Sequence, residues 1–209
     1  RNLSPNDVCL IQAIRKPLPF RSKDWLEFSR ERAQKEGSAR AGNVFVTDRS
    51  QEIVVLMERT SKPIIVIDDF QYILANEFMR RSEEKGYEKF NDIGRHAWDI
   101  LTAANNLAAS KRVYIFGHTQ TDDFGRTKVK TVGKMLDDKI VVEGMFSIVL
   151  RSVVNDGKYM LSTRTNGQDP VKAPMGLFED DMIDNDLLEV DRAICEFTGI
   201  NHTAPVQLT

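Results

Sequence analysis

The sequence predicts an α/β fold, with a mostly parallel sheet flanked by helices and a C-terminal antiparallel β-hairpin. Two apolar runs, 63–70 and 112–117, show no alternation. Such runs are typical of strands buried on both faces in a parallel sheet. Helical periodicity fills much of the chain between them. Asn155-Asp156-Gly157 then joins two strand-like segments and is a strong hairpin signal. We therefore expect a doubly wound domain with an antiparallel extension.

The first sixty residues predict two short strands and one clear helix. In order, we expect a strand at 8–14, a proline-containing loop at 16–20, a solvated helix or excursion at 21–42, a strand at 43–47 and a helix at 50–59. Ser50 is expected to be the N-cap of that helix, with Ile53, Leu56 and Met57 on its buried face.

The remainder alternates between helices, strands and irregular segments. We expect helices at 74–85 and 88–109, a long polar loop at 119–139, strands at 144–154 and 159–165, an irregular segment at 166–182 and a helix at 186–198 ended by Gly199. The buried face of the second helix is predicted to hold Trp98, Ile100, Leu101, Ala104 and Leu107. A polar loop as long as 119–139 is typical of functional or mobile segments.

Length and composition indicate a single domain that covers residues 1–209. The net charge of −2 creates no strong global attraction for nucleic acid, so a DNA site must be a local patch. Cys9 and Cys195 lie in apolar contexts without C-x-x-C spacing, which indicates buried, reduced thiols in a cytosolic protein. No apolar run approaches the roughly 18 residues of a membrane span, so no membrane partner is expected.

The strand at 63–70 ends in two acids, Asp68 and Asp69, as a Walker B strand does. In P-loop NTPases the first acid holds the Mg²⁺ shell, and a following acid acts as general base toward the attacking water. We therefore assign Asp68 to metal and Asp69 to catalysis. The alternative is a pair of helix N-cap residues.

The strand at 112–117 is followed by polar residues that reach the same sheet edge. His118 and Gln120 are predicted to contact the γ-phosphate and to signal its loss to the following loop. A structural role for His118 is the alternative. The three histidines, His96, His118 and His202, show no metal-ligand spacing, which argues against a zinc site.

Two groups of cations are further candidates. The polar loop carries Arg126, Lys128, Lys130, Lys134 and Lys139, a basic patch that is predicted to follow a nucleic-acid backbone. Arg164 lies just before a Gly turn and Lys172 lies two residues before Pro174, and both are predicted to form a cationic finger toward a neighbouring subunit's phosphates. In both cases an ordinary solvated surface is the alternative. A G-x-x-x-x-G-K-[ST] loop is absent from these 209 residues.

Nearly the whole chain resembles the RecA-like AAA-type P-loop ATPases of bacteriophages, which are related to phage single-strand-annealing recombination ATPases. The resemblance rests on the order and spacing of segments such as KPLPF, IIVIDDFQYI, FGHTQ, DGKYMLSTRTNG, KAPMGLFED and IDNDLLEVDRAI. In that family a segment like Arg1-Asn2-Leu3 follows directly after the P-loop lysine. The resemblance thus implies that the chain begins just past the Walker A motif.

The resemblance implies ATP and Mg²⁺ as cofactors, and a place in DNA recombination or replication in the host cytoplasm of an infected bacterium. It gives Asp68 and Asp69 the Walker B roles, His118 the sensor position and Lys172 the trans-acting finger. Single-stranded DNA, a homo-oligomeric ring or filament, and phage recombination proteins are the implied partners. A DNA-dependent ATPase is therefore the leading expectation. A non-hydrolysing single-stranded-DNA-binding or annealing-partner module, with a vestigial nucleotide site, is the alternative. A small-molecule kinase fits the C-terminal third less well.

Overall fold

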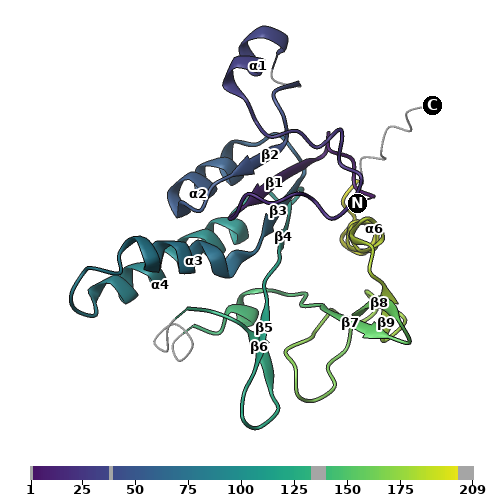
Figure 1. Cartoon of the computed structure of the whole chain (residues 1–209). Helices are drawn as coiled ribbons and strands as arrows, with labels where there is room; N and C mark the ends of the chain where they lie inside the picture. Colours follow the sequence, from purple (N-terminus) through teal and green to yellow (C-terminus); the bar gives the residue numbers. More distant parts are fainter. Residues whose placement is uncertain (1, 38–39, 133–139, 202–209) are drawn as a thin grey trace.

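The computed structural model describes residues 2–37, 40–132 and 140–201, and its centre is a four-stranded parallel sheet. The strand order is β2 (Val44–Val46), β1 (Val8–Gln12), β3 (Ile64–Asp68) and β4 (Arg112–Ile115) (Figure 1). β1 and β3 are the two inner strands. Their register pairs Val8 with Ile64 and Gln12 with Asp68, so both strands end at the same level.

One face of the sheet is covered by three helices: α2 (Ser50–Arg59), α3 (Phe70–Arg80) and α4 (Glu88–Asn105). Cys9 and Ile11 of β1, with Ile65 and Ile67 of β3, point into this layer and are fully buried. The helices contribute Ile53, Met57, Phe70, Ile73, Leu74, Ile93, Ala97, Ile100 and Leu101. Because side chains alternate along a strand, the residues between them must supply the opposite face.

The opposite face has its own smaller core. Val8, Leu10, Ile64 and Val66 pack there against Leu188 of α6 (Leu187–Thr198). The connection from β1 to β2 adds Leu18 and Trp25 to this layer, while α1 (Arg30–Glu36) contributes no buried residue. Both faces of the sheet are therefore covered, which confirms the predicted mostly parallel sheet flanked by helices.

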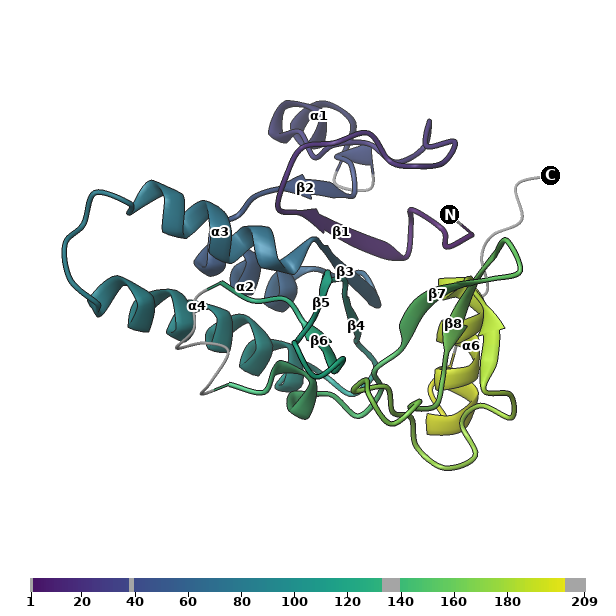
Figure 2. The same cartoon turned by 60° about the horizontal axis from the view of Figure 1, so that its bottom comes forward.

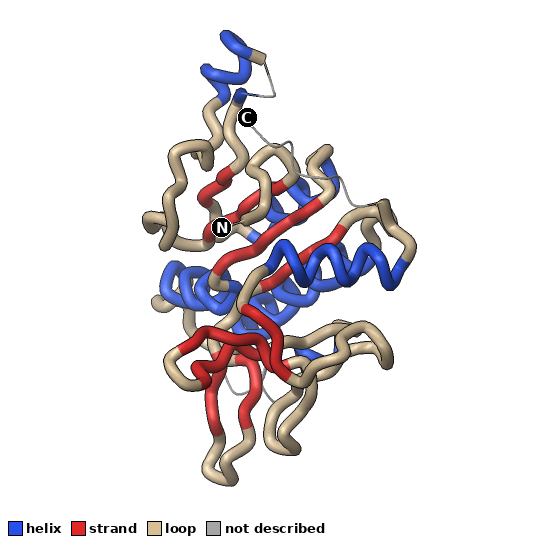
Figure 3. The backbone as a smooth tube through the Cα atoms, turned by 90° about the vertical axis from the view of Figure 1, so that its right-hand side faces the viewer, coloured by secondary structure: helices blue, strands red, loops and turns tan. Residues whose placement is uncertain are grey.

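Two antiparallel units follow the parallel sheet in the chain and lie below it in Figures 1 and 3. The first is a hairpin of β5 (Thr119–Thr121) and β6 (Thr127–Val129). The second is a three-stranded sheet of β7 (Arg151–Asn155), β8 (Lys158–Ser162) and β9 (Met182–Asp184), beside α6 in Figure 2. A short 3₁₀ helix, η2 (Val142–Met145), lies between the two units in the chain.

Two turn predictions are confirmed by backbone geometry. Asp156 and Gly157 join β7 to β8 with φ values of 47° and 77°, the left-handed pair that a type I′ hairpin requires. Gly199 follows α6 in the left-handed region with φ of 70°, and Asp186 caps the other end by accepting from the Leu188 N–H.

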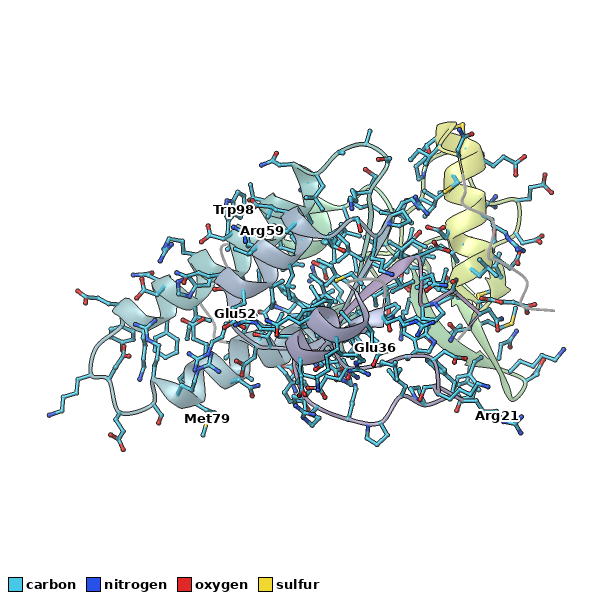
Figure 4. All side chains as sticks on the ribbon, turned by 90° about the horizontal axis from the view of Figure 1, so that it is seen from above. Arg21, Glu36, Glu52, Arg59, Met79 and Trp98 are labelled. Carbon is cyan, nitrogen blue, oxygen red and sulfur yellow. The ribbon has the colours of Figure 1, made fainter. Side chains whose placement is uncertain are left out.

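Several local predictions are wrong, and tertiary packing explains most of them. Trp98 is 47% exposed and lies on the outer side of α4 (Figure 4), because Ile93, Ala97 and Leu101 form the stripe that meets the sheet. The helix N-cap is Arg49 rather than Ser50, without a side-chain cap, and Thr47 accepts from the Arg49 N–H instead.

The loops and strands of the C-terminal half also differ in detail. The predicted polar loop contains the β5–β6 hairpin, and the strand expected from residue 144 begins only at Arg151, after η2. The segment 166–182 was expected to be irregular, but its last residue begins β9, a strand that was not predicted. The predicted burial of the two thiols is confirmed, since Cys9 and Cys195 are both buried and free. Among the described residues, no helix is both long and apolar enough to cross a membrane.

Candidate functional site at the carboxyl ends of β1 and β3

The neighbouring strands β1 and β3 mark the point at which the sheet reverses its topology. From β1 the chain passes over the face that holds Leu18 and Trp25 and reaches β2 on one side. From β3 it passes through α3 and α4 on the other face and reaches β4 on the opposite side. In open α/β sheets, ligands bind outside the carboxyl ends of the strands at such a switch point.

Asp68 and Asp69 lie at this switch point, at the end of β3. Asp68 is the last residue of the strand and lies in register with Gln12, the last residue of β1. Asp69 adopts a left-handed conformation, with φ of 63° and ψ of 52°. A residue other than glycine rarely adopts this conformation, and such strain is found most often at functional sites.

The strained Asp69 is the N-cap residue of α3 by position but not by hydrogen bonding. Its side chain makes no capping hydrogen bond to the helix. It contacts Lys16 and His118 instead, with 3.3 Å between His118 Nε2 and Asp69 Oδ1. The geometry therefore argues against the alternative in which Asp69 only caps a helix.

Lys16 joins the two acids from the loop after β1. Its Nζ lies 3.3 Å from Asp68 Oδ2 and makes a closer contact with Asp69 Oδ2. The loop is held against β3, because the Ala13 N–H donates to the Asp68 carbonyl over 3.3 Å. Gln12, almost fully buried, donates its Nε2 to the Lys16 carbonyl over 3.3 Å.

His118 reaches the acids from the chain that follows β4. The Phe70 N–H donates to the Phe116 carbonyl over 2.9 Å, which ties the start of α3 to this segment. The buried Gln71 accepts from the His118 N–H over 3.3 Å. The Tyr72 ring lies edge-on to the imidazole with 6.4 Å between ring centroids. The backbone of His118 is therefore held in place, although its imidazole ring is largely exposed to solvent.

The side chains of Asp68, Asp69, Lys16 and His118 form an acidic cluster. Two carboxylates face one ammonium and one imidazole. Desolvation lowers the pKa of Lys16, but hydrogen bonds and charge from Asp69 and Asp68 outweigh it, so the net pKa lies above the ordinary value. The cluster is half-open to solvent: the side chains of Asp69 and Asp68 are 14% and 22% exposed. A ligand can thus reach these carboxylates.

The donor set suits Mg²⁺ carried by a phosphate ligand rather than a metal held by protein alone. Within the described ranges, no group of three or more His, Cys, Asp or Glu side chains is arranged to hold a metal ion. Mg²⁺ is usually bound by one or two carboxylates together with waters and substrate phosphates. Asp68 and Asp69 supply two such carboxylates, so these residues fit the cofactor that the sequence analysis expects.

The basic segment predicted for nucleic acid begins one residue after His118 and forms the β5–β6 hairpin. Gln120 lies on β5, in register with Lys128 on β6. The Lys130 N–H donates to the His118 carbonyl over 2.7 Å, which joins the base of the hairpin to the acidic cluster. A buried carboxylate, Glu143, accepts from the Val129 N–H over 2.6 Å and fixes β6.

The tip of this hairpin carries an exposed aromatic ring and side chains of both charges. Phe124 is 77% exposed, and the guanidinium carbon of Arg126 lies 5.4 Å from the centre of its ring. Arg126 also pairs with Asp122 at 3.7 Å, whereas Lys130 is exposed. The predicted residues Lys134 and Lys139 lie outside the described residues. The structure thus brings Gln120 and three of the five predicted cations onto one hairpin.

Arg164 and Lys172 belong to the C-terminal unit and not to the acidic cluster. Arg164 pairs with Asp181 at 2.6 Å and lines a hollow of about 250 Å³ together with Pro174 and Met175. Lys172 is exposed, and its backbone forms a bridge to Val149 through bonds of 2.8 and 3.0 Å. Across the described ranges, no ion pair joins either cation to Asp68 or Asp69.

The sequence analysis missed Lys16 and Gln71. Lys16 lies in a proline-containing loop whose path across the end of β3 has no local sequence signal. Gln71 lies in the first turn of a helix that was expected to begin at residue 74, so it was assigned to no element. One available signal was the position of Lys16 shortly after a buried strand, where loops of α/β proteins carry function.

Comparison of the chain with protein-family models, with curated proteins and with solved structures finds no match.

Proposed function

We propose that this chain carries the Walker B strand of an ATP-hydrolysing, RecA-like P-loop domain that acts on single-stranded DNA. The observation that supports it most is the strained Asp69, held beside Asp68 at the topological switch point of a parallel sheet. Its carboxylate is directed toward Lys16 and His118 rather than toward the helix it precedes. The proposal requires a phosphate-binding loop from sequence outside these 209 residues.

In this proposal each residue has a separate task. Asp68 holds Mg²⁺, which would supply charge neutralisation to the phosphates. Asp69 orients and deprotonates the attacking water. His118 lies between Asp69 and the base of the β5–β6 hairpin, through the 2.7 Å bond from the Lys130 N–H to its carbonyl. It therefore links the nucleotide to the hairpin.

The test is ATP hydrolysis, with and without single-stranded DNA, by a polypeptide that contains this chain together with a phosphate-binding loop. Asp69→Asn is expected to reduce turnover by a factor of about 10² or more while nucleotide binding persists, since general-base catalysis contributes about 10²–10⁴. Asp68→Asn is expected to weaken the Mg²⁺-dependent part of binding. Asp99→Asn, an exposed acid on α4, is the matched control. Normal hydrolysis by both site variants would show that the assignment is wrong.

The hairpin favours a second candidate function, a non-hydrolysing single-stranded-DNA-binding module. An exposed aromatic ring beside cations is the arrangement on which bases stack while the backbone follows positive charge. Phe124, Arg126 and Lys130 provide these groups at the tip and base of the hairpin. This candidate needs no nucleotide at the acidic cluster.

Substitutions in the hairpin test the DNA site in both candidates. Phe124→Ala is expected to weaken oligonucleotide binding by about 1–3 kcal/mol, the usual contribution of stacking one base. Neutralising Lys128 and Lys130 together is expected to flatten the dependence of affinity on salt, because fewer counterions are released. Fluorescence anisotropy at several salt concentrations measures both effects. Phe197→Ala on α6 is the exposed aromatic control. Unchanged affinity and salt slope in the hairpin variants would place DNA binding elsewhere.

A further inference from the structure

One ammonium group contacts both carboxylates of the acidic cluster. Lys16 Nζ lies 3.3 Å from Asp68 Oδ2 and closer still to Asp69 Oδ2. Carboxylate oxygens are also the ligands that a hard divalent cation takes. The lysine and a divalent cation would therefore use the same oxygens.

The position of Lys16 is determined by the fold and not by chance contact of a long side chain. Gln12 ends β1 in register with Asp68, and its buried amide donates to the Lys16 carbonyl over 3.3 Å. The Ala13 N–H donates to the Asp68 carbonyl over 3.3 Å, so the loop follows the end of β3. The backbone of Lys16 is thus anchored at the same sheet edge as the acids.

Within the described part of the chain, His118 and Arg15 contact oxygens other than the two that Lys16 contacts. His118 Nε2 lies 3.3 Å from the other oxygen of Asp69, Oδ1. Arg15, the neighbour of Lys16, is paired with Glu27. A divalent cation at Asp68 and Asp69 would therefore face the Lys16 ammonium at close range, and the two like charges repel each other.

We propose that Lys16 is an intramolecular competitor of the divalent cation, so that the cation binds tightly only when Lys16 leaves the carboxylates. This inference rests on the proposed function, which assigns a divalent cation to Asp68. A polyphosphate ligand would give the displaced ammonium a new anionic partner, since lysine is a common phosphate-binding residue. Lys16 thereby makes binding of the cation and binding of the anionic ligand favour each other.

Direct titration of the 209-residue chain with Mn²⁺ tests this competition without any measurement of activity. Lys16→Met keeps the aliphatic length of the side chain and removes its charge, and it is expected to raise Mn²⁺ affinity by a factor on the order of ten, within the usual range of coupling between two ligands. Lys16→Arg keeps the charge and is expected to retain the low affinity. Lys23→Met, an exposed lysine in the same connection, is the matched control and is expected to leave it unchanged.

A thermal measurement provides a second readout that also checks folding. Without Mn²⁺, Lys16→Met leaves two carboxylates without their counter-ion, so its midpoint is expected to fall below that of the unmodified chain. Added Mn²⁺ is expected to raise the midpoint of Lys16→Met more than that of the unmodified chain, because tighter binding stabilises the folded state by mass action.

The outcomes separate this inference from the proposed function. If Lys16→Met binds Mn²⁺ no more tightly than the unmodified chain, while Asp68→Asn abolishes binding, the competition is refuted and the metal site stands. If the two acid variants leave Mn²⁺ affinity unchanged, the assignment of the metal site fails as well. If neither the unmodified chain nor Lys16→Met binds Mn²⁺, the competition is refuted, whereas the proposed function, in which Mg²⁺ arrives with phosphate, is decided by the Mg²⁺-dependent nucleotide binding of Asp68→Asn.

Discussion

At the residue scale, Asp69 is distinguished by a left-handed backbone conformation outside any hairpin turn. Its φ of 63° places it, with Asp156, among the two described non-glycine residues with positive φ. Asp156 lies in a hairpin turn that requires this conformation, whereas Asp69 lies between a buried strand and a helix. The conformation of Asp69 directs its carboxylate to Lys16 and His118, which agrees with the role that we propose for it.

Because of this strain, we expect the glycine and alanine variants of Asp69 to reverse the order of stability that they usually have. Asp69→Gly is expected to be more stable than Asp69→Ala by about 1 kcal/mol, since the left-handed conformation costs an L-residue roughly 1–2 kcal/mol and glycine almost nothing. Both variants lose the same carboxylate, so their difference isolates the backbone. Urea denaturation of the two variants measures it.

The control for this comparison is an exposed position inside a helix. At Glu58 in α2, alanine is expected to be more stable than glycine by about 1 kcal/mol. If Asp69→Ala were the more stable variant at the site as well, Asp69 would not be strained in the protein.

At the element scale, a buried ion pair attaches α6 to the edge strand β4. Arg112 on β4 donates to both carboxylate oxygens of Asp191 on α6 over 2.7 and 3.0 Å. The Tyr114 hydroxyl donates to the same carboxylate over 2.6 Å. Arg112 and Asp191 are 6% and 0% exposed, and burial raises the pKa of Tyr114 above its ordinary value. These contacts hold α6 on the face of the sheet opposite to α2, α3 and α4.

Removing one partner of this pair is expected to be costly. Asp191→Ala leaves the Arg112 guanidinium buried without its counter-ion and should destabilise the protein by about 3–5 kcal/mol. Glu189→Ala, an exposed acid on the same helix, should cost less than about 1 kcal/mol. Chemical denaturation of each variant provides the measurement. An Asp191→Ala cost no larger than that of Glu189→Ala would show that the pair does not hold α6 in place.

A double substitution of Arg112 and Asp191 tests whether stability requires the charges themselves or only that neither charge is left unpaired. Arg112→Met combined with Asp191→Leu should lose less stability than Asp191→Ala alone, because no buried charge remains unpaired.

At the scale of the whole molecule, the free energy of unfolding is expected to change with pH in the alkaline range, because a thiol is buried in the core. Cys9 lies on the central strand β1 and is fully buried. Burial raises the pKa of its thiol from an ordinary 9.0 to about 11, although a hydrogen bond with Thr60 and the charges of Lys62 and Lys111 act in the opposite direction. Between these two pH values the unfolded chain loses the thiol proton while the folded protein keeps it.

The stabilising contribution of this thiol is therefore fully present below pH 9.0 and is lost as pH rises through about 11. Across that window, the free energy of unfolding should fall more steeply in the unmodified chain than in Cys9→Ala, by up to about 1.4 kcal/mol per pH unit. Urea denaturation at several alkaline pH values measures both slopes. Groups that titrate in both proteins, such as Tyr114, cancel in the comparison, and equal slopes would contradict the prediction.

The sequence by itself determined the parallel sheet, the two turns and the position of the acids at a strand end. Unalternated apolar runs need cover on both faces, and left-handed turn pairs need residues such as Asn, Asp and Gly, so these features have local causes. The order β2-β1-β3-β4, the contact of Lys16 with Asp68 and Asp69, and the Arg112–Asp191 pair were decided only by the tertiary structure. Those partners lie 52, 53 and 79 residues apart and come together because separate strands end at one sheet edge and a distant helix covers β4.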